Sequence, residues 1–174
     1  MSIEIIIEDA RWRSLEIATL AIEAERATFD YFGLDVADFE ISALGADDSR
    51  LAVLNASFRN KPTATNVLSW PSKVPARRAP GMPPALPQPS DQTELGDIAL
   101  AYETCRREAQ VSQVALKDHV LHLFVHGLLH LLGYDHLNDQ DALEMQRTEA
   151  DILKNLGIAN PYGEHNEMIG NMER

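Results

Sequence analysis

Five of the six histidines in this 174-residue chain lie between residues 119 and 136. Three of them, His126, His130 and His136, follow the spacing H-x-x-x-H-x-x-G-x-x-H. Residues four apart on a helix project from the same face, so His126 and His130 can bind one metal ion. Gly133 can adopt the left-handed backbone conformation that ends a helix, and the following turn would return His136 to that ion. The pattern therefore predicts a three-histidine metal site.

A site with three histidine ligands leaves a fourth position open, which is typical of catalytic rather than structural zinc sites. Zinc in such a site lowers the pKa of a bound water to about 7 and so makes water a usable nucleophile at neutral pH. We therefore expect one Zn²⁺ per chain and a hydrolytic reaction, although imidazole ligands also suit nickel and copper.

The residues beside the three histidines narrow the reaction class. Metalloproteases with this layout carry H-E-x-x-H, whose glutamate is the general base, whereas this chain has Gly127 at that position. Asp135, which precedes the third histidine, either orients a ligand or bonds the loop backbone. His122 extends the histidine stripe and is a candidate to support a ligand or to face the substrate, and His119 is a weaker one. The absence of the glutamate disfavours a protease.

Strand and helix signals alternate along the chain. Strands are expected over residues 3–7, 38–44, 65–70 and 95–101, and helices over 12–32, from 47 or 48 to about 55, 102–110, 118–132 and 139–156. This order predicts an α/β or α+β fold with a mixed sheet of about four strands packed with helices. The metal site would then lie on the 118–132 helix and the loop that follows it.

The domain organisation expected from the sequence is simple. Residues 1–159 should form a single domain, and residues 160–174 a polar, frayed C-terminal tail. Residues 71–90 contain seven of the nine prolines, which predicts an extended or mobile loop rather than a helix or strand.

Composition excludes several classes of protein. A single cysteine, Cys105, excludes a disulfide scaffold and an all-cysteine zinc site. The sequence has no run of about 18 apolar residues and no basic N-terminal region, so we expect neither a membrane span nor a signal peptide, and a cytoplasmic location.

The net charge of −12 is unevenly distributed. Residues 50–117 contain 9 basic and 5 acidic side chains, whereas the segments on either side are strongly acidic. An acidic chain usually avoids nucleic acid, but this basic middle third contains Arg59 and Lys61 and predicts a basic groove beside the metal. The alternative is that these charges simply form solvated faces.

The run HGLLHLLGYDH, with the upstream segments NASFRNKPTATNVLSWP and LGDIAL, resembles the YbeY family of metal-dependent endoribonucleases and rRNA maturation factors. The resemblance spans about residues 50–157 and implies that His126, His130 and His136 are zinc ligands. Arg59 matches an arginine regarded as functionally important in that family. The family also implies a four-stranded α/β fold with the metal site in a cleft. Asn66, where aspartate is more usual, and the long proline-rich loop are departures from the family pattern.

The resemblance implies a zinc-dependent, single-strand-specific endoribonuclease that acts in 16S rRNA 3′-end maturation and in ribosome biogenesis and quality control. Its expected partners are single-stranded rRNA, the small ribosomal subunit and ribosome-associated proteins, with neither DNA nor a membrane. We expect Arg59 to be catalytic, because a guanidinium can bind two phosphoryl oxygens of the transition state at once. The nucleophile is either water or the RNA 2′-hydroxyl, and no general base is identified. The alternatives are a non-enzymatic ribosome-assembly factor with structural zinc and a metalloprotease-like hydrolase.

Overall fold

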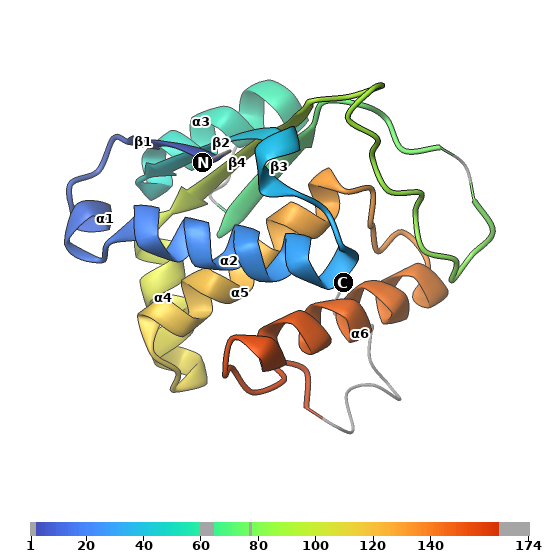
Figure 1. Ribbon diagram of the computed structural model, residues 1–174. Coiled ribbons are helices and arrows are strands. Elements are labelled where there is room, and N and C mark those ends of the chain that lie inside the picture. Colours follow the sequence, from blue (N-terminus) through green and yellow to red (C-terminus); the bar gives the residue numbers. More distant parts are fainter. Residues whose placement is uncertain (1–2, 60–64, 77, 164–174) are drawn as a thin grey trace.

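Four strands form one mixed sheet in the computed structural model, which describes residues 3–59, 65–76 and 78–163 (Figure 1). The strands are β1 (Ile3–Ile7), β2 (Glu40–Ala46), β3 (Val67–Pro71) and β4 (Glu94–Ala101), in the order β1-β2-β4-β3. β2 runs parallel to both β1 and β4, whereas β3 is antiparallel to β4. The predicted α+β fold with a four-stranded mixed sheet is therefore confirmed.

Helices cover both faces of this sheet. They are α1 (Arg11–Ser14), α2 (Ile17–Phe32), the short 3-10 helix η1 (Val36–Asp38), α3 (Asp48–Arg59), α4 (Tyr102–Ser112), α5 (Leu116–Leu131) and α6 (Asp139–Asn155). Helices α2 and α5 lie on the face opposite α3, and α6 packs beyond them against both (Figure 1). Among the described residues, no helix combines the length and apolarity that crossing a bilayer would require.

The prediction of one helix over residues 12–32 is wrong, because the chain breaks it between α1 and α2. Glu16 adopts a left-handed conformation with φ 62°, and α2 begins at Ile17. The cause is tertiary. The Trp12 indole is fully buried and donates a hydrogen bond to the Ala46 carbonyl at 2.8 Å. A Cβ at Gly45 would lie 2.8 Å from the Trp12 ring, so α1 is tied to the end of β2 and the chain must turn before α2.

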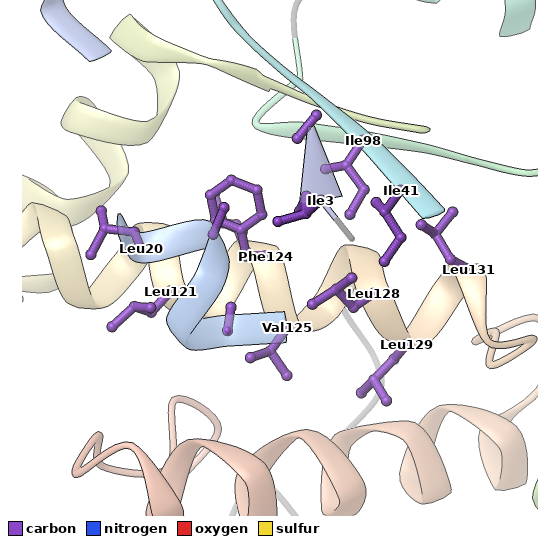
Figure 2. Close-up of a cluster of buried hydrophobic side chains, with 14 of the residues drawn as sticks. Ile3, Leu20, Ile41, Ile98, Leu121, Phe124, Val125, Leu128, Leu129 and Leu131 are labelled. Atoms are coloured by element: carbon purple, nitrogen blue, oxygen red, sulfur yellow. The ribbon is translucent and has the colours of Figure 1, made fainter. Parts of the chain in front are cut away.

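Helix α5 lies at the centre of the hydrophobic core (Figure 2). On one side, Ile41 and Ile98 project from the sheet toward α5, where Leu128 meets them. On the other side, Val125 and Leu129 point toward α6. Because both sides are buried, α5 presents only a narrow strip of its surface to solvent.

Gly96 lies where β3, β4 and α5 pack tightly together. Its φ is 137°, and a Cβ there would lie 2.1 Å from the Trp70 carbonyl oxygen and 2.9 Å from Leu131 Cδ2. We expect Gly96→Ala to lower the free energy of unfolding by about 3 kcal/mol, because backbone strain adds to a clash with main chain. Urea unfolding of the variant and the wild type measures this loss of stability. Gly33 has φ 69°, and a Cβ added there would meet no described atom within 4 Å outside its chain neighbours and its own helix, so Gly33→Ala should cost only about 1 kcal/mol. Equal losses in the two variants would contradict this account.

Candidate metal centre

Histidines form the one strip of α5 between residues 120 and 131 that is not fully buried. Between residues 120 and 131 every side chain is buried except His122, His126 and His130. His119 continues the same strip one turn earlier and is also half-buried. These positions are three or four apart, so the histidines line one edge of a helix that is otherwise packed into the core.

The structure brings His126, His130 and His136 together. Each offers a ring nitrogen, and these three atoms lie within 4.8 Å of one another. His126 Nε2 and His130 Nε2 are 3.2 Å apart. The His136 ring lies 5.9 Å from the His126 ring and 5.1 Å from the His130 ring, centre to centre.

The turn that returns His136 follows the predicted mechanism. Helix α5 ends at Leu131, and Gly133 takes a positive φ of 103°. The Tyr134 N–H then donates to the Leu129 carbonyl at 3.0 Å and closes the reversal. The loop between α5 and α6 therefore runs back beside the last turn of α5, which carries His130.

Hydrogen bonds on the far side of each ring orient the first two histidines. His130 Nδ1 lies 2.9 Å from the Tyr134 carbonyl oxygen, and His126 Nδ1 lies 3.3 Å from Glu149 Oε2. Both partners are acceptors, so each Nδ1 carries the proton and each Nε2 keeps its lone pair. Metal-ligating histidines generally donate their second ring N–H to a carbonyl or carboxylate in this way.

The electrostatics of the cluster suit a cation. Burial, reinforced by repulsion from His126 and His136, lowers the pKa of His130 to about 3. The imidazole is therefore neutral at physiological pH, which is the form that binds metal. Three imidazoles with converging ring nitrogens fit a divalent ion such as zinc, so the cluster is able to hold one.

Glu149 is the residue at this site that the sequence analysis missed. It lies on α6, its side chain is completely buried, and its carboxylate contacts His126 and His122, the latter at 2.5 Å. Burial alone would raise the pKa of Glu149, but the charges and hydrogen bonds of the two histidines outweigh it and hold the pKa below its usual value. The sequence contains one feature that could have identified Glu149: it is a carboxylate on the apolar face of an amphipathic helix, between Met145 and Ile152.

The segment after α6 also contributes to the site, which corrects the expectation that the chain frays from residue 160. Tyr162 is buried, and its hydroxyl lies 2.9 Å from Glu149 Oε2. Its backbone N–H donates to Asn160 Oδ1 at 2.9 Å. Tyr162 thus holds this segment against α6, while residues 164–174 of the predicted tail lie outside the described part of the chain.

Gly127 and Asp135, which stand beside the three histidines in the sequence, contact other parts of the protein. Gly127 faces the sheet, since a Cβ there would lie 3.1 Å from Ile98 Cδ1 and 3.2 Å from Ser69 Oγ. A glutamate at this position would enter a packed interface. Asp135 Oδ1 accepts the Leu137 N–H at 3.4 Å, which is the loop-bonding alternative.

The proline-rich loop packs against the turn that carries His136. Between β3 and β4, its described residues form no helix or strand, as predicted. The Gly81 N–H donates to Asp141 Oδ1 at 2.8 Å, at the start of α6. Pro84 lies against Gly133, where an added Cβ would come within 3.0 Å of the proline Cβ. The loop therefore covers both ends of the segment between α5 and α6.

Arg59 is the last residue of α3, but its side chain lies outside the described part of the chain, as does all of Lys61. Other basic residues of the middle third form salt bridges with carboxylates; these pairs are Arg50–Glu8, Arg107–Asp48 and Lys117–Glu16. These three cations are thus partly neutralised within the chain.

A groove of about 900 Å³ at the sheet is acidic rather than basic. Among the residues that the structure describes, those lining it include four carboxylates, of Glu4, Glu40, Glu94 and Asp97, and no lysine or arginine. Burial and the neighbouring Glu94 raise the pKa of Asp97. Because these carboxylates would repel a phosphate backbone, the groove is unfavourable for RNA binding.

Comparison with known proteins gives one consistent result. The family model described as endoribonuclease YbeY matches residues 4–157. Relatives of that name from Dinoroseobacter shibae and Jannaschia sp. are each 52% identical, covering 92% and 93% of this chain and 90% and 100% of theirs. The solution structure of TM1509 from Thermotoga maritima shares the fold, with a TM-score of 0.58, 20% identity and coverage of 95% of this chain and 93% of that one.

The cluster predicts stoichiometric metal binding. We expect one Zn²⁺ per chain, and a rise in stability of about 2.7 kcal/mol when free zinc is 100 times its dissociation constant. His130→Ala should abolish this gain, because the neutral ligand at the centre of the cluster is lost. Calorimetric titration measures the zinc stoichiometry, and thermal unfolding with and without zinc measures the gain in stability. His119→Ala is the matched control on the same helix, since His119 instead pairs with Glu108 at 2.8 Å. Undiminished zinc binding by His130→Ala would exclude this site.

Proposed function

This chain belongs to the endoribonuclease YbeY family, and from that membership together with its histidine cluster we propose that it is a zinc-dependent endoribonuclease. The observation that carries the proposal is the convergence of His126 and His130 of α5 with His136 of the following loop, whose ring nitrogens lie within 4.8 Å of one another. Zinc is the ion we assign, because three imidazoles and an open fourth position are typical of catalytic zinc sites.

The substrate we propose is single-stranded rRNA at the 3′ end of 16S rRNA, within ribosome biogenesis and quality control. The family resemblance supports this substrate. We propose the small ribosomal subunit and ribosome-associated proteins as partners, and the cytoplasm as the location. The geometry adds a physical reason for single-strand preference. The three histidines are partly buried, and a flexible strand can bring its phosphodiester to a partly buried site more readily than a rigid A-form duplex.

The side chains have distinct roles in the proposed reaction. His126, His130 and His136 would hold the ion, and the Tyr134 carbonyl orients His130. When bound, the ion would supply Lewis acidity that activates a nucleophile and neutralises phosphoryl charge. Arg59 would bind two oxygens of the phosphoryl group as negative charge develops in the transition state.

Two observations favour this function over its alternatives. A protease of the H-E-x-x-H type needs a glutamate at position 127, but that position faces Ile98 and Ser69 in the sheet. A structural zinc site normally has four protein ligands. Within residues 3–59, 65–76 and 78–163, the group able to hold a metal has only three members, so a position remains for a reacting molecule.

Removal of the metal should abolish RNA cleavage. We expect a single-stranded oligonucleotide matching the rRNA 3′ end to be cut by the zinc-loaded protein, not by chelator-treated protein, and again after zinc is restored. The same sequence annealed into a duplex should resist cleavage. Cleavage is measured in each condition by gel electrophoresis of the end-labelled RNA. Full cleavage by metal-free protein would overturn the proposal. Co-purification with ribosomes but no cleavage would indicate an assembly factor, and casein hydrolysis a protease.

Substitution of Arg59 should slow cleavage without loss of metal. We expect Arg59→Ala to lower the cleavage rate by about 100-fold at unchanged zinc content, as is usual when one transition-state donor is removed. Arg59→Lys should recover only part of the rate, because an ammonium cannot bind two oxygens in a fixed fork. Arg50→Ala is the matched control on α3, since Arg50 pairs with Glu8 at 3.2 Å. Comparable rates for Arg59→Ala and Arg50→Ala would remove Arg59 from the mechanism.

A further inference from the structure

We propose that Glu149 is a positioning residue that fixes the metal ligand His126, and that Tyr162 of the segment after α6 fixes Glu149 in turn. The inference rests on the proposed metal site and goes beyond it. It assigns a role in metal binding to two residues that lie outside the histidine motif.

The contacts around the Glu149 carboxylate support this role. Oε1 pairs with His122 Nε2 at 2.5 Å, and Oε2 pairs with His126 Nδ1 at 3.3 Å. The Tyr162 hydroxyl lies 3.1 Å from Oε1 and 2.9 Å from Oε2. Each carboxylate oxygen thus has two partners, and the group cannot rotate without breaking contacts to α5 and to the C-terminal segment at once.

The burial of Glu149 argues against a role in stability alone. Its side chain is 0% exposed, and burying an ionised carboxylate is unfavourable unless it is fully hydrogen-bonded. Buried ion pairs can often be replaced by apolar residues with little loss of stability, or with a gain. A charged residue at this core position is therefore better explained by what it does for its partner. The partner whose orientation matters for chemistry is His126.

The effect on His126 follows from ordinary imidazole chemistry. A carboxylate at Nδ1 fixes the proton on that nitrogen and leaves the lone pair on Nε2, which faces the Nε2 of His130. It also holds the ring in one plane and increases the basicity of the ligating nitrogen. The Tyr134 carbonyl does the same for His130, so the two helical histidines are oriented from two different segments of the chain.

Tyr162 extends the network to the segment after α6. Its hydroxyl contacts both oxygens of Glu149, and its backbone is held by the Asn160 side chain. The docking of residues 160–163 and the orientation of His126 are therefore linked through one carboxylate. By linkage, a change that loosens Tyr162 should weaken metal binding through Glu149 and His126.

The test compares zinc affinity in three variants. Glu149→Gln keeps the side-chain shape but replaces one carboxylate oxygen by an NH2 donor, so His122 and His126 can no longer each meet an acceptor oxygen, and we expect the zinc dissociation constant to rise about 10- to 100-fold. Tyr162→Phe removes one hydroxyl and should raise it by roughly 3- to 10-fold. Glu108→Gln is the matched control, because it makes the same change in the carboxylate that pairs with His119 on the same helix. It should change the constant less than about twofold.

Zinc affinity is measured by competition with a chromophoric chelator. The visible spectrum of the cobalt-substituted proteins reports the ligand geometry, and thermal unfolding of the metal-free proteins reports stability. We expect the cobalt spectrum of Glu149→Gln to differ from that of the wild type, while that of Glu108→Gln matches it.

The outcomes separate this inference from the proposed function. Wild-type protein that binds no zinc would overturn both. If the wild type binds zinc and Glu149→Gln has the same zinc affinity and the same cobalt spectrum, the positioning role alone is overturned. This holds even if the Tm of metal-free Glu149→Gln is lowered. If Glu149→Gln does not fold, Tyr162→Phe decides, because it leaves every charge in place. Weakened zinc binding in a folded Tyr162→Phe supports the inference, and unchanged binding overturns it.

Discussion

The burial of helix α5 on two sides is the constraint on which the rest of this structure depends. Leu128 meets the isoleucines of the sheet, while Val125 and Leu129 point toward α6. Burial of this much apolar surface holds the helix in one rotational setting, because a turn about its axis would expose leucines and bury histidines. The histidine strip is therefore aimed by hydrophobic packing. Gly127 contributes to this packing, since it lets the helix lie close to Ile98 and Ser69.

A second constraint acts on the polar side of the helix. The candidate site lies between a hydrophobic core and a buried carboxylate, where the effective dielectric constant is low and hydrogen bonds are strong. His126 and His130 each have one nitrogen fixed by a partner from outside α5, which leaves the other free. Glu149 is the one carboxylate among these partners, and its negative charge partly offsets a divalent ion without occupying a coordination position.

The segments that are least regular in the sequence complete the site. The proline-rich loop packs on Gly133 and bonds Asp141, so it covers the turn that carries His136. The segment at Tyr162 reaches Glu149 from the other end of α6. Proline restricts the backbone of the free chain, so ordering the loop against the turn loses less conformational entropy than ordering a flexible loop would. Neither segment has helical or strand periodicity, and both derive their structure from contacts with α5, α6 or the loop between them.

The sequence by itself determined those features that depend on neighbours in the chain. The spacing of His126 and His130, the turn at Gly133 and the periodicity of most helices and strands are local properties, so they could be predicted. Only the tertiary structure decided the strand order, the break before Ile17 and the partnership of Glu149 with His126. The break comes from Trp12 packing on the end of β2, and the partnership joins residues 23 positions apart on different helices. Contacts of this kind are set by how elements pack, and no period in the sequence encodes them.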